Sequence, residues 1–114
     1  MTGVIFHPKV PGEVREILDY YDEISPRLAD EFWVELMEGI RKAVENPEAF
    51  HYDVHGRRRC NLKKFPYNFL YKVTDGGIRV TAVRHNKRDP KFGSRRQQYR
   101  QQDAARNPST DVSE

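Results

Sequence analysis

The sequence predicts an α+β fold in which an N-terminal strand precedes an antiparallel helix hairpin and a three-stranded antiparallel meander. Two observations lead to this prediction. Apolar residues recur at helical spacing over residues 10–45, and they alternate with other residues over residues 58–83. Short turn signals separate the alternating segments, so consecutive strands should pair antiparallel. Both helices should cover one face of the sheet, because each apolar helix stripe needs an apolar surface to bury against.

The first predicted elements are a short strand and a helix. The apolar triplet at residues 4–6 forms the strand, and His7-Pro8 ends it. A helix is expected from about residue 10 to residue 24, with Pro11 in its first turn, where a missing N–H does no harm. Glu13 suits the N-terminal end of the helix dipole. Its apolar stripe consists of Val10, Val14, Ile17, Leu18, Tyr21 and Ile24.

A second helix is expected to start at Ser25-Pro26, with Ser25 as the N-cap and Pro26 as the first helical residue. Asn46-Pro47 ends it. Almost no loop separates the two helices, so they should form an antiparallel hairpin. The second helix has an apolar stripe so wide that it needs a partner surface, and Trp33 is expected to belong to the core. The stripe consists of Leu28, Ala29, Phe32, Trp33, Leu36, Ile40, Ala43 and Val44.

Three strands are expected after a loop at residues 48–56. Phe65-Pro66 separates the first two strands, and Asp75-Gly76-Gly77 is a hairpin turn signal between the last two. Side chains alternate between the two faces, and a register change of one residue would exchange the two sets. The face beneath the helices is expected to hold Cys60, Leu62, Phe69, Tyr71, Val73, Ile78, Val80 and Ala82. The open face is expected to be cationic, with Arg59, Lys63, Lys72, Arg79, Thr81 and His85.

The charge of the chain is unevenly distributed. Residues 1–56 carry 5 Lys/Arg and 12 Asp/Glu, a net charge of −7, whereas residues 57–114 carry 15 and 5, a net charge of +10. A cationic half of this kind predicts an acidic partner, either nucleic acid or an acidic protein segment. The alternative is that the acidic helices lie beside the basic strands and neutralise them within one domain.

The length of 114 residues fits one domain, which is expected over residues 1–92. Residues 93–114 are polar and are expected to form a flexible or weakly helical tail. A single cysteine, Cys60, excludes an internal disulfide and favours a reducing, cytoplasmic compartment. No apolar run is long enough to span a bilayer, and no signal peptide is visible, so no membrane association is expected.

Two basic motifs are candidates for function. Residues 56–64 carry five cations, which predicts a phosphate- or carboxylate-binding surface, because Arg binds such groups in bidentate fashion. The alternative is a solubilising strand that protects a sheet edge. At the end of the last strand, His85 stands beside several cations that would suit RNA cleavage through the 2′-OH. Residue chemistry alone favours the alternative, a strand end closed by the Arg88-Asp89 pair.

A possible metal-binding pattern occurs at residues 51–55, where His51 and His55 flank Asp53. These residues follow a helix stop and belong to a loop, so no shared helix face aligns the two rings. No cysteine pair supports them. Neither a metal nor another cofactor is therefore expected, and Cys60 is expected to be buried and inert.

Six segments are together typical of one known family. They are residues 17–21 (ILDYY), 28–32 (LADEF), 45–47 (ENP), 58–62 (RRCNL), 65–67 (FPY) and 83–90 (VRHNKRDP). In this order and spacing they resemble the ParE/RelE superfamily of toxins from type II toxin–antitoxin systems, over residues 4–92. The resemblance implies the RelE-like βααβββ fold, a growth-inhibiting toxin, and a cognate antitoxin whose C-terminal segment covers the open sheet and adjoining surfaces.

The superfamily contains gyrase inhibitors and ribosome-dependent mRNA endonucleases. The His-x-x-Arg-Asp ending at residues 85–89 is similar to ParE-type members, whose action on DNA gyrase depends on the C-terminal region, and it favours a gyrase inhibitor. The alternative is a RelE-like endonuclease with Lys63, Arg84 and His85 as catalytic candidates, although residues 71–72 read Tyr-Lys where RelE-type enzymes carry a functional Arg. A non-toxic basic binding module is a further alternative. Contacts to the target or the antitoxin are expected from Arg57, Arg59, Lys63, Lys72, Arg79, Arg88, Phe92, Arg95 and Arg96.

Overall fold

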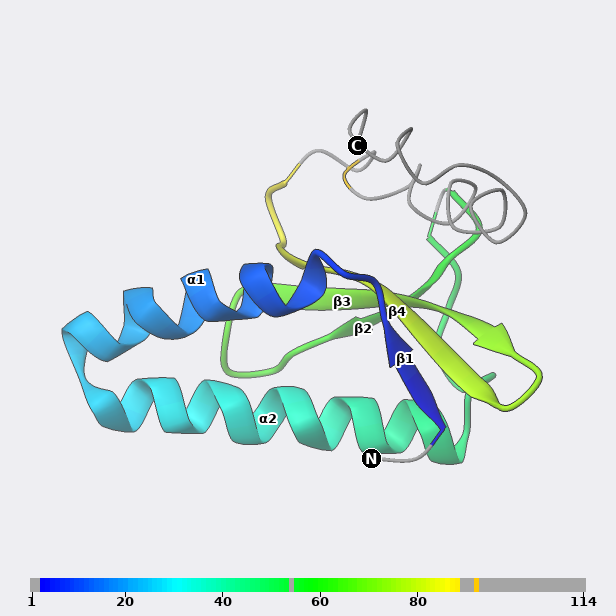
Figure 1. Ribbon diagram of the computed structural model, residues 1–114, viewed down its shortest axis with the longest axis horizontal. Helices are drawn as coiled ribbons and strands as arrows, with labels where there is room; N and C mark the ends of the chain where they lie inside the picture. Colours follow the sequence, from blue (N-terminus) through cyan, green and yellow to red (C-terminus); the bar gives the residue numbers. More distant parts are fainter. Residues whose placement is uncertain (1–2, 54, 89–91, 93–114) are drawn as a thin grey trace.

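The computed structural model describes residues 3–53, 55–88 and 92 of the chain. In chain order the elements are β1 (Val4–Phe6), α1 (Val10–Ile24), α2 (Pro26–Glu45), β2 (Arg58–Asn61), β3 (Tyr67–Thr74) and β4 (Gly77–His85). The two helices run antiparallel and lie together on one side of the sheet (Figure 1). The predicted α+β fold is therefore confirmed. The predicted tail, with Arg95 and Arg96, lies outside the described residues.

Ser25 connects the two helices by itself. Its backbone N–H closes α1 by donating to the carbonyl of Tyr21 at 2.8 Å, and its hydroxyl accepts from the N–H of Arg27 at 3.3 Å. Its extended backbone, with φ −168° and ψ 127°, turns the chain from one helix into the next. Pro26 follows as the first residue of α2, where no N–H partner is needed. The hairpin is thus as tight as its sequence predicts.

The strands form one sheet in the order β1-β4-β3-β2. The meander of β2, β3 and β4 is antiparallel, as predicted, whereas β1 pairs parallel with β4 through Val4 with Ile78 and Phe6 with Val80. The sheet is therefore mixed rather than purely antiparallel. Parallel pairing needs a long connection, which the helix hairpin and the first strands of the meander provide.

The core lies between the helix hairpin and the sheet. Phe32, Leu36 and Ile40 of α2 are at most 1% exposed. The ring of Phe32 packs edge-on against Phe65 and Tyr67, with centroids 5.4 and 5.5 Å away. Full burial of a large apolar side chain contributes roughly 1.5–3 kcal/mol, so these contacts hold the hairpin on the sheet. Neither described helix combines the length and the apolar composition that a membrane span requires.

A β-bulge at Thr81 changes the face that each later residue of β4 occupies. Leu70 of β3 pairs with Ala82, but Tyr71 pairs with Val80, so Thr81 is an extra residue on β4. Side chains alternate along a strand, and one extra residue reverses the alternation beyond it. The residues after Thr81 therefore lie on the faces opposite to those that a regular strand would give them.

This reversal makes two of the predicted placements wrong. Ala82, which was expected beneath the helices, lies opposite Leu70 on the face turned away from the helices, the far face. Val83 joins the core instead, opposite Phe69, and His85 lies on the helix side with its ring 5.0 Å from Tyr67. The sequence carries no sign of the bulge, because Thr, Ala and Val at positions 81–83 are compatible with either face.

Gly77 begins β4 where β1 approaches it. Its φ is 152°, and a Cβ at this position would lie 1.9 Å from the carbonyl oxygen of Gly3. Gly77→Ala should lower the free energy of unfolding by about 1–3 kcal/mol, because it strains the backbone and displaces β1. The neighbouring Gly76 has open space at its Cβ position, so Gly76→Ala is the matched control and should leave the stability nearly unchanged. Urea unfolding followed by the fluorescence of Trp33 measures both, and equal losses would contradict the prediction.

Candidate functional site

Three of the predicted contact cations lie on the far face of the sheet. Arg59 of β2 pairs with Leu70, which pairs in turn with Ala82, and Lys72 of β3 pairs directly with Arg79 of β4. The three cations are half-buried, and among the described residues none of them forms an ion pair. Like charges that face each other across strands are destabilising, so an anion bound here would stabilise this face. The structure thus brings these three residues together on one face.

Arg57 is not on the surface, although it was predicted as a contact residue. Its side chain is fully buried, and its guanidinium donates to one carboxylate oxygen of Asp53 from Nη2 at 2.6 Å and from Nε at 3.1 Å. The backbone N–H of Arg57 donates to the other oxygen at 2.9 Å. Nη1 donates to the backbone carbonyl of Phe92 at 2.9 Å. Arg57 therefore links the loop before β2 to the chain after β4.

Lys63 is separated from the other two candidates for RNA cleavage. It lies beyond the end of β2, and its backbone N–H donates to the carboxylate of Glu35 on α2. Its side chain lines a hollow on the flank of α2, together with Arg27 and Lys64. The prediction that Lys63 belongs to a strand on the open cationic face is therefore wrong, because β2 ends at Asn61.

Arg84 and His85 line a different hollow, and they are consecutive residues of β4. Arg84 is 5% exposed and donates from Nε to Oδ1 of Asn68 at 3.3 Å, on the far face. His85 lies on the helix side against Tyr67. The sequence places these two residues next to each other, but the strand directs them to opposite faces.

The polar hollow that Arg84 and His85 line has a volume of about 250 Å³ and lies between α1 and the end of β4. The guanidinium of Arg88 lies 4.4 Å over the ring of Phe92, so two predicted contact residues meet at this hollow. Glu13 of α1 accepts a hydrogen bond from the N–H of Val83 at 3.0 Å and joins α1 to β4. The lining residues are Glu13, Glu16, Ile17, Tyr20, Tyr67, Val83, Arg84, His85, Arg88 and Phe92.

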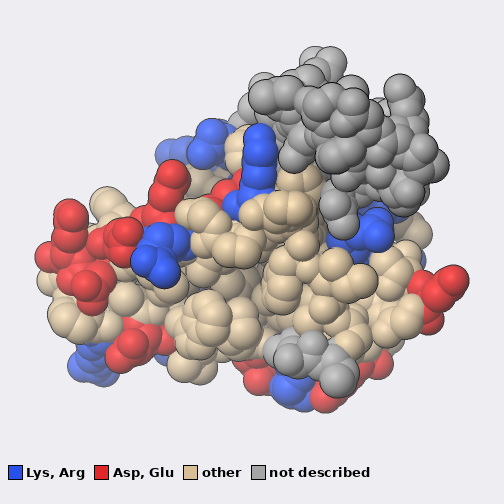
Figure 2. All heavy atoms as spheres, in the orientation of Figure 1, with Lys and Arg blue, Asp and Glu red and all other residues tan. Residues whose placement is uncertain are grey.

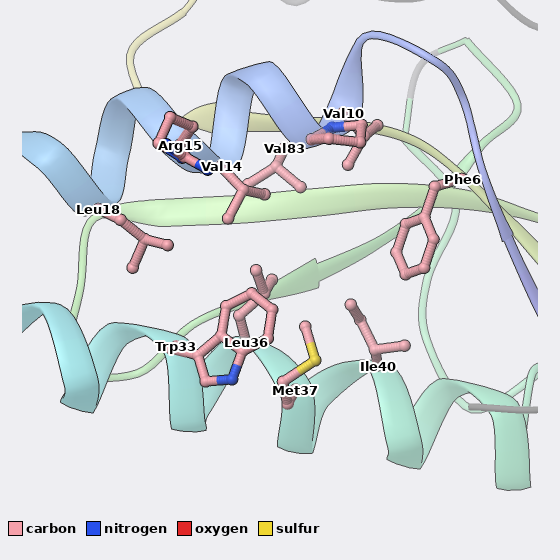
Figure 3. Close-up of a pocket in the computed structure, with 11 residues that line it drawn as sticks. Phe6, Val10, Val14, Arg15, Leu18, Trp33, Leu36, Met37, Ile40 and Val83 are labelled. Carbon is pink, nitrogen blue, oxygen red and sulfur yellow. The ribbon is translucent and has the colours of Figure 1, made fainter.

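An apolar groove of about 460 Å³ opens between the two helices. Figure 3 shows Trp33 and Met37 of α2 facing Val14 and Leu18 of α1 across it, with Phe6 of β1 at one end. Trp33 is 46% exposed and Phe6 is 39% exposed. The groove therefore exposes an aromatic side chain from α2 and one from β1 to solvent.

Sequence reasoning missed this groove, because it assigned Trp33 to the core. The signal was the width of the apolar stripe on α2, which is broader than the surface that α1 and the sheet bury. Phe32 and Leu36 of this stripe are at most 1% exposed, whereas Trp33 keeps nearly half of its surface in contact with solvent. The partner surface that such a stripe requires is therefore only partly supplied by the chain itself.

The charged side chains of the described residues are unevenly distributed over the surface. Figure 2 shows acidic side chains gathered around the closed end of the hairpin and an uncharged surface between the helices. Three of the four ion pairs found among the described residues lie within α2, and the fourth joins Asp53 to Arg57. None of them connects a helix to a strand.

Within the pattern of His51, Asp53 and His55, the side chain of Asp53 has a structural role. Asp53 accepts from the N–H of His55 at 2.9 Å and holds the guanidinium of Arg57. Among the residues that the structure describes, no three His, Cys, Asp or Glu side chains are arranged to hold a metal ion.

Comparison with known proteins assigns the chain to a class. Residues 4–90 match the sequence pattern of the family described as "ParE toxin of type II toxin-antitoxin system, parDE". The chain therefore belongs to the ParE toxin family, and the predicted membership in the ParE/RelE superfamily is confirmed.

Individual relatives agree with this assignment. The chain is 28% identical over 85 residues to Toxin ParE2 of Mycobacterium tuberculosis, strains CDC 1551 / Oshkosh and ATCC 25618 / H37Rv, and each alignment covers 74% of this chain and 81% of the relative. A solved structure described as "Chromosomal ParDE TA system from P. aeruginosa" has a TM-score of 0.63 and 21% identity, and covers 75% of this chain and 96% of that one. At this identity the similarity shows a shared fold.

The Asp53–Arg57 pair predicts a loss of stability in acid. Burial by itself would raise the pKa of Asp53, but the hydrogen bonds and the charge of Arg57 outweigh it and lower the pKa below its ordinary value of 3.8. The contribution of this carboxylate is therefore complete above pH 3.8 and is lost as the pH falls through the lower pKa of the folded state. Asp53→Asn should remove this part of the pH dependence and, because it breaks a buried ion pair, cost about 3–5 kcal/mol at neutral pH.

Urea unfolding at neutral pH and at a series of acidic pH values measures both effects. Glu45→Gln is the control, because it breaks the exposed ion pair with Arg41 and should change the stability by at most about 1 kcal/mol. A stability of Asp53→Asn equal to that of the wild type at neutral pH would show that the buried pair does not stabilise the loop.

Proposed function

We propose that this ParE family toxin inhibits DNA gyrase in the cytoplasm and that a cognate antitoxin neutralises it. The observation that most supports gyrase over RNA as the target is the separation of Lys63 from Arg84 and His85, since they line different hollows. Cleavage through the 2′-OH needs a base and cations that reach the same phosphodiester. An inhibitor of gyrase needs only a binding surface, and Arg88 and Phe92 at the polar hollow offer one.

The antitoxin is expected to place an amphipathic helix in the apolar groove between α1 and α2. The groove has the features of a helix-binding site, because it is lined by aliphatic and aromatic side chains and bounded by two helices. Membership in a toxin–antitoxin family implies a cognate antitoxin, which is the partner that we assign to this groove. Trp33 is the expected anchor, since half-exposed aromatic side chains in grooves commonly carry much of the binding energy. This proposal adds the groove to the open sheet, which was the antitoxin surface expected from the sequence.

The gyrase proposal predicts that the purified protein inhibits supercoiling by gyrase and leaves mRNA intact during growth arrest. Phe92→Ala should weaken inhibition by about 30-fold, the factor that corresponds to the loss of roughly 2 kcal/mol at an aromatic contact. Supercoiling assays at graded toxin concentrations measure this change, and primer extension on cellular mRNA reports cleavage.

Lys64→Ala is the matched control, because Lys64 lines a hollow on the flank of α2 and is not among the residues that line the polar hollow with Phe92. It should inhibit gyrase as well as the wild type does. A wild-type protein that leaves supercoiling untouched would refute the gyrase proposal. Codon-linked cleavage that disappears in His85→Ala would establish the RelE-like endonuclease instead.

The antitoxin proposal predicts that Trp33→Ala weakens binding of the antitoxin about 30-fold, because a buried aromatic anchor contributes roughly 2 kcal/mol. Val34→Ala is the control, since Val34 is the neighbouring residue, is 65% exposed and lines the other flank of α2. Isothermal titration calorimetry with the antitoxin encoded beside the toxin measures both affinities. Equal affinities of the two variants would exclude the groove as the antitoxin site.

A further inference from the structure

We propose that Arg57 is a positioning residue that holds Phe92 at the rim of the polar hollow and so presents Phe92 to the toxin's target. The proposal deepens the proposed function, because it rests on the role of Phe92 in contacting the target. It concerns a residue that sequence reasoning treated as a surface contact and that the structure places in the interior.

The first step is the geometry of the guanidinium of Arg57. Two of its nitrogens bind the carboxylate of Asp53, and the third binds the carbonyl of Phe92, which lies 35 residues further along the chain. The pair with Asp53 is local and orders the loop before β2. The bond to Phe92 is not local, and it attaches the chain after β4 to that loop. A residue that served only the loop would need only the carboxylate.

The second step is the way Phe92 is held from its other side. The guanidinium of Arg88 lies 4.4 Å over the ring of Phe92, a cation–π contact. Arg88 is itself fixed just after β4, because its N–H donates to the carbonyl of His85 at 3.0 Å. Phe92 is therefore held through its backbone by Arg57 and through its ring by Arg88, and its ring helps to line the polar hollow.

The third step is the chemistry that requires arginine at position 57. The planar guanidinium presents its N–H donors in a fixed fork, so one side chain binds Asp53 through two nitrogens and the carbonyl of Phe92 through another. A lysine ammonium keeps the positive charge beside Asp53 but lacks the fork, and it cannot hold both partners in this geometry. Arg57→Lys should therefore keep the loop and release Phe92.

Release of Phe92 should lower the activity on the target and leave the affinity for the antitoxin unchanged. The apolar groove is lined by residues of β1, α1, α2 and β4, and Arg57 is not among them. Arg57→Lys is therefore expected to keep its affinity for the antitoxin while its toxicity falls. A merely structural role for Arg57 would lower both together, since both depend on the fold.

The test uses the full chain with 4-fluorophenylalanine at position 92. Fluorine NMR of the wild type should show a resonance distinct from that of the urea-unfolded chain, and in Arg57→Lys it should move towards the unfolded position. Colony counts after induction without antitoxin should show at least a tenfold loss of growth arrest, with antitoxin affinity unchanged. Arg58→Lys is the matched control, because Arg58 binds the carbonyl of Phe50 and the hydroxyl of Tyr52 and should change neither readout.

Other results of these two measurements would contradict the proposal. An unchanged fluorine resonance in Arg57→Lys would overturn the anchoring of Phe92 by Arg57. A released Phe92 with full toxicity would overturn the role of Arg57 in presenting Phe92 to the target. If Arg57→Lys fails to fold, Arg88→Gln releases the ring from its other side and should move the same resonance. Growth arrest by a wild type that leaves gyrase active would refute the gyrase target and not the anchor. A wild type without growth arrest would refute the proposed function and the positioning role together, and the fluorine resonance would still decide the anchor.

Discussion

The burial of the helix hairpin on one face of the sheet is the contact on which the other features of this protein depend. Phe32, Leu36 and Ile40 of α2 and Phe69, Tyr71 and Val80 of the sheet are at most 1% exposed, and together they form the centre of the core. This contact fixes the relation of α1, α2 and the sheet. It thereby creates the groove between the helices, leaves the far face of the sheet outside the helix layer and sets the position of β4 against α1.

Strand β4 joins the N-terminal strand to the antiparallel meander, since it pairs with β1 on one side and with β3 on the other. Its bulge at Thr81 places Val83 in the core, Arg84 on the far face and His85 on the helix side. A regular strand would have placed His85 among the far-face cations. The bulge therefore separates a histidine from the basic cluster that a catalytic role in RNA cleavage would require, while it keeps the end of β4 beside α1.

The surfaces proposed for the two partners lie in different parts of the molecule. The groove between α1 and α2 is apolar, and the hollow at the end of β4 is polar and combines carboxylates, arginines and aromatic rings. Val83 lines both, so the two surfaces share a wall. An antitoxin in the groove would thus lie close to the target surface.

The sequence alone determined the elements, their order and the antiparallel pairing of β2, β3 and β4, because helical spacing, Ser25-Pro26 and the Asp75-Gly76-Gly77 turn are local signals. It also indicated that Arg59, Lys72 and Arg79 share a face, since strand alternation extends to neighbouring strands. The parallel pairing of β1, the bulge at Thr81 and the burial of Arg57 were decided by the tertiary structure. Each depends on a partner distant in the chain: Gly3 and Ile78 for β1, the register of β3 for Thr81, and the carbonyl of Phe92 for Arg57. Local patterns carry no information about such partners, so an arginine that sequence reasoning assigns to the surface can be one of the most buried residues of the fold.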